Sequence, residues 1–210
     1  MTKQEIQQKV LQNGKPLSLN KFTWDEKTNT FSTNKNNLVF DFNDIYGINF
    51  ITGFYCTFDT GNHCTFKTGS YCTFKTGDYC TFKTGLGCTF KTGDYCTFGT
   101  GYNCTFDTGY NCTFDTIYNC TFNTGSYCTF KTGSYCIFNN IQKNCILIRR
   151  DIFETYILPE DKSIKLNAFS IKGYKEIKSK EEIEITLKIN GEEKPLSEIL
   201  EETLLRLRKL

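Results

Sequence analysis

Several features that point to familiar functions are scarce in this chain of 210 residues. It has one histidine, which excludes His-rich zinc sites and leaves His63 as the one possible base of a catalytic triad. Its 25 basic and 23 acidic side chains give a formal net charge of +2. That balance argues against a nucleic-acid or membrane-surface binder, because such proteins carry a strong basic excess. Three prolines leave little room for linkers.

Long apolar runs are missing as well. The longest, Cys145–Ile148, is far shorter than the roughly 20 residues that span a bilayer. The segment Met1–Val10 lacks the apolar core of a secretory signal. We therefore expect a cytoplasmic protein with reduced thiols, or a virion-associated one if the gene belongs to a phage.

Cysteine is the residue in excess, and its spacing is regular. Each of the first eleven cysteines opens a unit Cys-Thr-Phe-x-Thr-Gly-x-Tyr or a close variant, eight residues long. Ile48–Gly53 and Phe40–Phe42 continue the phase upstream, so residues 40–147 contain fourteen octads. Self-similarity at a short fixed period indicates a solenoid. The twelve cysteines are Cys56, Cys64, Cys72, Cys80, Cys88, Cys96, Cys104, Cys112, Cys120, Cys128, Cys136 and Cys145.

Side-chain alternation along the octad predicts which positions face inward. Cys, Phe and the second Thr, at offsets 0, +2 and +4, share one face of a strand, and the variable residue at +3 lies on the other. The variable residue is often charged, so its face is the outer one. We expect the Gly at +5 to turn the corner with a positive φ. Ile117 replaces this Gly in one octad and is expected to be strained there.

The number of octads per coil decides the cross-section. Two octads predict a two-sided parallel β-solenoid of about 16 residues per coil, with Phe facing Phe across the core. Three octads, which make a triangular coil, are the alternative. The expected fold class is therefore mainly β, with a small N-terminal cap and a C-terminal α+β cap that ends in a helix.

The repeat resembles the short-period parallel β-solenoids, a class that includes pentapeptide-repeat, hexapeptide and RTX-type proteins. It is most similar to an octapeptide-type group of low-GC bacteria and their phages. The resemblance implies an architecture for residues 40–147 and no activity. The Gly-Gly-x-Gly-x-Asp calcium turn of RTX proteins is absent, and His63 merely replaces a Tyr of the repeat. Neither calcium binding nor the acyltransferase chemistry of hexapeptide helices is therefore implied.

The flanking segments read as caps. Residues 1–39 are expected to form a helix that Asn13-Gly14 ends, followed by a hairpin that joins Trp24 to Phe31. Residues 148–210 form the second cap. Its expected strands are Ile152–Leu158, Ile164–Ile171 and Ile183–Ile189.

The expected C-terminal helix, Ser197–Leu210, carries an apolar stripe and is too short to be stable alone. It must pack on its own chain or on another subunit. The stripe is therefore a candidate homo-oligomer contact, formed by Leu196, Leu200, Leu204 and Leu207.

No catalytic, metal or cofactor site is predicted. The cysteine spacing is that of the fold, and free cysteine packs as a small hydrophobe, with metal, redox or disulfide roles as alternatives. No phosphate-cradling loop, nucleophile elbow or carboxylate pair stands out, so no enzyme is expected. The candidate binding surface combines outward Lys residues with Tyr residues that precede Cys. Its members are Lys67, Lys75, Lys83, Lys91, Tyr71, Tyr79 and Tyr95.

These features favour a rigid, non-catalytic shaft for protein–protein contact. We expect a protein partner, and we do not expect nucleic-acid binding. A phage-encoded shaft would be a virion part or an inhibitor of a host protein. The alternative is a carbohydrate-binding or adhesive shaft that uses the Tyr column. Ice binding is a weaker alternative, because the exposed column beside the Thr column is charged.

Overall fold

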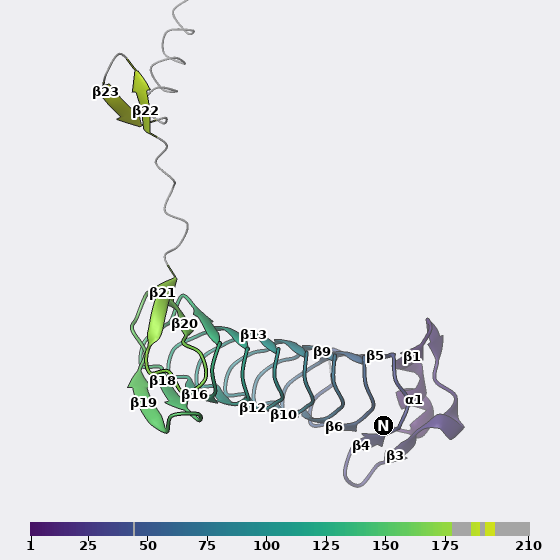
Figure 1. Cartoon of the computed structure of the whole chain (residues 1–210). Coiled ribbons are helices and arrows are strands. Elements are labelled where there is room, and N and C mark those ends of the chain that lie inside the picture. The colour runs from purple at the N-terminus through teal and green to yellow at the C-terminus, as the bar shows by residue number, and fades with distance from the viewer. Residues whose placement is uncertain (44, 178–185, 190–191, 196–210) are drawn as a thin grey trace, which may run out of the picture. The chain divides into compact units, whose positions relative to one another are not determined.

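A computed structural model describes residues 1–43, 45–177, 186–189 and 192–195. The chain divides into two compact units, Met1–Ile177 and Lys178–Leu210. The first unit is a parallel β-solenoid in which two sheets face each other (Figure 1). In-register partners such as Phe82 and Phe98 lie 16 residues apart, which confirms the predicted coil of two octads.

Sheet A has eleven strands and sheet B has ten. The parallel run of sheet A is β5 (Leu38–Phe42), β7 (Thr57–Thr60), β9 (Thr73–Lys75), β11 (Thr89–Lys91), β13 (Thr105–Thr108), β15 (Thr121–Thr124) and β17 (Ile137–Asn139). The parallel run of sheet B is β4 (Thr30–Ser32), β6 (Asn49–Ile51), β8 (Thr65–Lys67), β10 (Thr81–Lys83), β12 (Thr97–Gly99), β14 (Thr113–Asp115), β16 (Thr129–Thr132) and β18 (Ile146–Arg149). Consecutive octads alternate between the sheets.

The Phe residues at offset +2 form the centre of the core. Within a sheet their rings stack, as Phe82 does on Phe98 with centroids 4.8 Å apart and planes 2° apart. Across the core the rings meet edge to face, as Phe90 does with Phe98 at 5.2 Å and 75°. Both geometries are favourable for aromatic pairs. Phe therefore faces Phe, as expected.

The expectation of positive φ at the Gly of offset +5 was wrong. The left-handed residue is the one directly before each Cys, for example Tyr79 with φ 57° and Asn111 with φ 54°. Asn adopts this region more readily than other residues with side chains. Some Tyr residues in this slot stack on an aromatic ring of the next coil, as Tyr79 does on Tyr95.

The Gly at +5 is required by crowding between coils. A Cβ on Gly125 would lie 2.9 Å from the carbonyl carbon of Gly109 and 2.9 Å from the nitrogen of Tyr110, both in the preceding coil. Ile117 does not have a positive φ, so the strain expected there is absent. Its backbone nitrogen is 3.4 Å from the Gly101 oxygen, whereas Gly125 makes the equivalent bond at 3.0 Å. The equivalent distance from Gly77 to Gly61 is also 3.4 Å, so the Ile117 side chain does not separate the coils beyond the range of the repeat.

The N-terminal segment closes both sheets. α1 (Lys3–Gln8) begins with the predicted capping box of Thr2 and Glu5. Contrary to expectation it ends before Val10, because β1 (Val10–Gln12) pairs antiparallel with β5 and covers the edge of sheet A. The remaining elements are β2 (Lys15–Pro16), η1 (Leu19–Lys21) and β3 (Thr23–Asp25). β3 pairs antiparallel with β4, placing Trp24 opposite Phe31.

Antiparallel strands also close the other end. β19 (Glu154–Ile157) pairs with β18, and β20 (Ser163–Leu166) pairs with β17 and with β21 (Tyr174–Ile177). In the second unit β22 (Thr186–Ile189) pairs antiparallel with β23 (Glu192–Pro195). The expected helix Ser197–Leu210 and the stripe of Leu196, Leu200, Leu204 and Leu207 lie outside the described residues.

Replacing one central ring tests the core. Phe98 is fully buried, so Phe98→Ala is expected to lower the free energy of unfolding by about 3–5 kcal/mol through lost burial and a cavity. Tyr46 is 73% exposed, and Tyr46→Ala should change it by less than about 0.5 kcal/mol. Urea denaturation of both variants provides the comparison. Equal midpoints would contradict the inward position of Phe98.

Two Gly→Ala changes test the crowding between coils. Gly125→Ala should destabilise the protein, because its Cβ would press on backbone atoms of the preceding coil. Gly99, in β12, has no positive φ, and its Cβ would meet nothing closer than 3.6 Å. Gly99→Ala should therefore stabilise by about 0.4–1 kcal/mol, since the unfolded chain loses freedom. Shifts of the same sign in thermal unfolding would argue against this origin of the Gly column.

Candidate functional site

The predicted lysine cluster is divided between the two sheets. Lys75 and Lys91 are register neighbours in sheet A, whereas Lys67 and Lys83 are register neighbours in sheet B. The division follows from the alternation of octads, which sends consecutive +3 residues to opposite faces of the shaft. The four lysines therefore do not form one surface.

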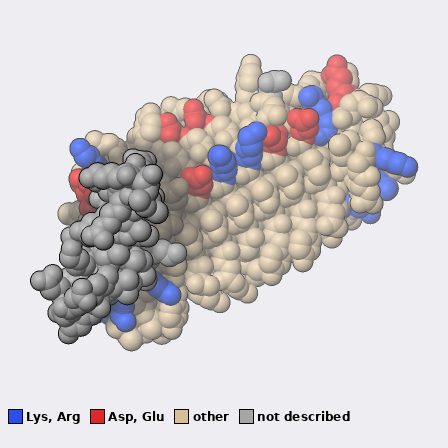
Figure 2. All heavy atoms as spheres, turned by 90° about the horizontal axis from the view of Figure 1, so that it is seen from above, with Lys and Arg blue, Asp and Glu red and all other residues tan. Residues whose placement is uncertain are grey.

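On sheet A the lysines belong to a mixed row. Asp59 precedes Lys75 in register, and Asp107 follows Lys91. The Lys75 Nζ lies 2.8 Å from the Asp59 Oδ2. Figure 2 shows a row of acidic and basic side chains along the shaft, with a broad area without charged residues on one side of it. Its charges are locally balanced, and exposed pairs of this kind contribute little to stability.

On sheet B the charges are sparser. Lys67 and Lys83 are flanked in register by Ile51 and Gly99, so neither has an acidic register neighbour. The next residue in the row is Asp115, which forms an ion pair with Arg150. This face therefore carries a small positive patch in the early coils.

The tyrosine column is also divided. Tyr71 lies at the corner that leads into sheet A and stacks with Tyr55 at 5.2 Å. Tyr79 and Tyr95 lie at the opposite corner, where they stack at 4.8 Å with parallel rings. His63 occupies the next place in that column, 4.9 Å from Tyr79. These side chains are about half exposed, but their faces are turned to one another. They present ring edges and hydroxyl groups to solvent.

The cysteines form two buried thiol columns, one under each corner. The first thiol column contains Cys56, Cys72, Cys88, Cys104, Cys120 and Cys136, and the second contains Cys64, Cys80, Cys96, Cys112, Cys128 and Cys145. All twelve are free thiols.

Every thiol except that of Cys136 lies within hydrogen-bond distance of a corner carbonyl. The Cys96 thiol donates to the carbonyl oxygen of Gly77 at 3.6 Å and to that of Asp94 at 3.4 Å. The backbone N–H of Cys56 donates to the Cys72 Sγ at 3.4 Å, so this thiol also contacts the preceding coil. The expected role of cysteine as a small core residue agrees with this burial.

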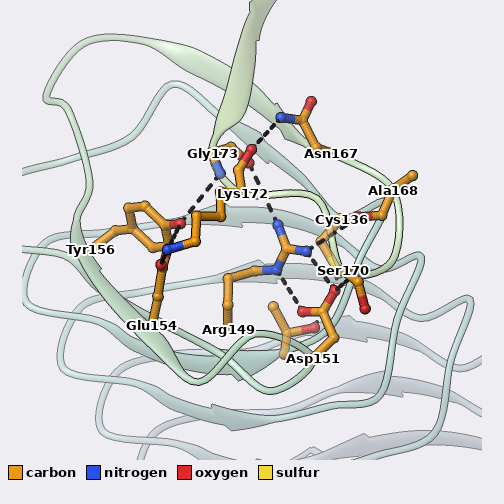
Figure 3. Close-up of polar contacts among 11 residues, drawn as sticks. Cys136, Arg149, Asp151, Glu154, Tyr156, Asn167, Ala168, Ser170, Lys172 and Gly173 are labelled. Atoms are coloured by element: carbon orange, nitrogen blue, oxygen red, sulfur yellow. Dashed lines mark hydrogen bonds and ion pairs between the residues drawn. The ribbon is translucent and has the colours of Figure 1, made fainter.

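A buried ion pair lies at the C-terminal end of the solenoid. Arg149, at the end of β18, is fully buried, and its Nε and Nη2 donate to the two carboxylate oxygens of Asp151 at 2.8 and 2.6 Å. Nη1 and Nη2 also reach the carbonyl oxygens of Gly173 and Ala168, each at 3.5 Å. Figure 3 shows that these partners come from two loops. Arg149 therefore ties the β18–β19 loop to the β20–β21 loop.

Asp151 and Glu154 complete this polar network. The Ser170 N–H donates to the Asp151 Oδ2 at 3.1 Å, and hydrogen bonds from Arg149 hold the pKa of Asp151 below its usual range. Lys172 and then Tyr156 lower the pKa of Glu154 (Figure 3). The anionic forms of both carboxyl groups are thereby favoured at neutral pH.

Beside this network lies a mostly apolar hollow of about 240 Å³. Ile117 and Tyr118, at a corner of the shaft, are 47% and 40% exposed, and Phe169 of the β20–β21 loop is 68% exposed. We call this cavity the end hollow. It is lined by Ile117, Tyr118, Gly133, Ser134, Arg150, Asp151 and Phe169.

Sequence reasoning did not identify the end hollow, although signals existed. Ile117 is the one residue other than Gly at offset +5 between Gly53 and Gly133. Arg149 stands four residues after Cys145, in the inward slot that Thr fills elsewhere, so an inward charge could have been predicted from the phase. Phe169 belongs to no repeat and carries no comparable signal.

The chain matches no protein-family model, no curated protein and no solved structure. The parallel solenoid stands on the structure itself, and the octapeptide family and a phage origin stay predictions. In the described part of the chain, no helix has both the length and the apolar character that crossing a bilayer requires.

Replacing Arg149 tests the buried ion pair. Arg149→Met leaves the Asp151 carboxylate, whose side chain is 4% exposed, without its cation. This should cost about 3–5 kcal/mol near pH 7. The lowered pKa of Asp151 gives stability that is present above its unfolded value of about 3.9 and lost as the pH falls through the folded pKa. The difference between the wild type and the variant should therefore shrink as the pH approaches 3.

Urea denaturation between pH 7 and pH 3 measures this difference. Lys172→Met is the control, because Lys172 pairs with Glu154 while its own side chain is 78% exposed. Its cost should stay below about 1 kcal/mol. A difference between wild type and Arg149→Met that is small at pH 7, or that grows in acid, would rule out this role of the pair.

Proposed function

We propose that the protein is a rigid, non-catalytic β-solenoid that binds another protein at its end hollow. The observation that carries the proposal is the place of Ile117. Between Gly53 and Gly133, Ile117 is the one residue that interrupts the Gly column, and it puts a half-exposed apolar side chain at the hollow, next to the exposed Phe169.

Exposed apolar clusters on ordered surfaces are typical of protein contact sites. Phe153, in the β18–β19 loop, is 92% exposed and has a left-handed φ of 55°. A Phe in this conformation is strained, and strain of this kind tends to persist at functional sites. Phe153 belongs to the same loop as the hollow residues Arg150 and Asp151.

The site is also held in place before a partner arrives. The Arg149–Asp151 pair and the Ser170 bond fix both loops against the shaft. The stacked Phe core makes the shaft itself regular. Binding to a preorganised surface loses less conformational entropy than binding to mobile loops.

The carbohydrate alternative has weaker support. Sugar rings pack on the faces of aromatic side chains, whereas the faces of Tyr79 and Tyr95 cover each other. Tyr71 lies at the other corner of the shaft. The predicted surface of Lys and Tyr residues therefore lacks a common face on which a ligand could lie.

Two substitutions that restore the repeat consensus give a matched test. Ile117→Gly removes the side chain from the hollow and should preserve the fold, because the other octads tolerate Gly there. Ile146 is 40% exposed at a +1 position where the repeat has Thr, so Ile146→Thr is the control. Immobilised wild type and variants are compared for the proteins that each retains from an extract of the source cells.

The expected result is a protein retained by wild type and by Ile146→Thr, with at least about 30-fold weaker binding to Ile117→Gly and to Phe169→Ser, the scale of a hot-spot residue. Light scattering of the intact chain tests whether the partner is a second copy. Equal retention by all four proteins, or no retention together with a monomeric mass, would contradict the proposal.

A further inference from the structure

The two thiol columns have a spacing that suits one kind of metal coordination. Equivalent atoms of successive coils are related by the rise of the solenoid, which the Phe stacks report. Phe66 and Phe82 lie 4.9 Å apart with planes within 3°, and Phe82 and Phe98 lie 4.8 Å apart with planes within 2°. Because neighbouring coils are nearly pure translations of one another, we expect the sulfur atoms of a column to repeat at this same spacing.

This spacing is too long for a disulfide between successive thiols but short enough for one metal ion to bridge them. A disulfide needs sulfur atoms about 2.05 Å apart, far less than the coil spacing. A zinc–thiolate bond is about 2.3 Å long, and an ion with bonds of this length, bound in a line between two sulfur atoms, spans about 4.6 Å. The columns therefore match linear two-sulfur coordination without a change of the coil spacing.

Tetrahedral coordination fits less well. Bonds of about 2.3 Å at the tetrahedral angle would place two sulfur atoms about 3.8 Å apart, about 1 Å closer than the coils allow. Zinc also needs further ligands. Among residues 1–43, 45–177, 186–189 and 192–195, no three His, Cys, Asp or Glu side chains converge as a metal site. The geometry thus disfavours zinc and favours metal ions that form two-coordinate complexes.

The softness of the sulfur ligands and the net charge of the complex restrict the choice of ion further. Thiol and thiolate ligands favour soft ions such as Cu(I). A monovalent ion bound by one thiolate and one neutral thiol makes a complex without net charge, which a buried site tolerates. The thiols are at most 1% exposed, and both columns lie directly beneath corners, where Tyr, Asn and Gly residues form the cover.

We propose that each thiol column binds monovalent soft metal ions, of the class of Cu(I) and Ag(I), in linear sites between cysteines of successive coils. When an ion enters, one thiol loses its proton to solvent and forms the metal–sulfur bond, and the neighbouring thiol donates a sulfur lone pair. One proton leaves for each ion, with no change of oxidation state. This binding is independent of the protein contact at the end hollow.

Silver(I) is the probe, because it resists the redox reactions of copper. The folded chain is titrated with silver nitrate in chloride-free buffer and followed by native mass spectrometry, proton release and X-ray absorption. Twelve thiols taken in adjacent pairs predict six ions, with one proton released per ion and two sulfur ligands per silver. Three or four sulfur ligands per silver, or no uptake by the folded chain, would overturn the proposal.

Two variants with equal numbers of thiols separate spacing from thiol content. The column variant replaces the whole first thiol column by Ala and leaves the second intact. The alternating variant replaces every second thiol of both columns by Ala, at Cys56, Cys88, Cys120, Cys64, Cys96 and Cys128. Each keeps six thiols, but in the alternating variant the nearest thiols of a column are two coils apart.

The column variant should bind three silver ions and the alternating variant none. Circular dichroism and urea midpoints establish that both are folded. If either is unfolded, the single change Cys96→Ala replaces it. That change leaves two pairs and one single thiol in the second column, which predicts the loss of one ion. Equal uptake by the two folded variants, as unfolded chains would also show, or full uptake by Cys96→Ala, would refute linear pairing.

Discussion

Stacking of one coil on the next at 4.8–5.0 Å is the constraint on which the rest of this structure depends. Because the coils repeat in register, every octad position becomes a column along the shaft. The Phe column stacks its rings, and the Gly column lets the backbones approach. The Cys column satisfies corner carbonyls with its thiols. At each octad position the side chain must therefore pack against the equivalent side chains of the neighbouring coils as well as be suitably buried or exposed.

The same constraint makes the ends of the shaft different from its middle. An end coil has no successor, so its backbone edge and its core would be open to water and to other strands. Antiparallel strands solve this at both ends, with β1 on β5 and with β19 and β20 on the last coils. At the C-terminal end an inward Arg149 replaces the Thr of the repeat and gathers two loops. The Arg149–Asp151 ion pair thus holds together the loops that connect the closing strands.

Departures from the repeat locate the sites that the repeat itself cannot explain. A uniform shaft offers the same chemistry at every coil, so it has no single place for a partner. Ile117 breaks this uniformity at the end hollow, where Phe169 from outside the repeat meets the shaft. The thiol columns are the opposite case, because their inferred chemistry depends on the repeat being unbroken.

The sequence by itself determined the period and the inward set of Cys, Phe and Thr, because these follow from alternation within a strand and from the length of the octad. It favoured a coil of two octads over one of three, and the structure decided between them. The sequence also indicated the Thr2 capping box. Only the tertiary structure decided that Lys67 and Lys83 lie on one face while Lys75 and Lys91 lie on the other, and that Gly125 is small because of the coil before it. It alone joined Arg149 to Ala168 and Ile117 to the hollow beside Phe169. Alternation is a local property of the chain. These contacts join residues that are far apart in the sequence, so they depend on the three-dimensional path of the chain, which residue spacing does not specify.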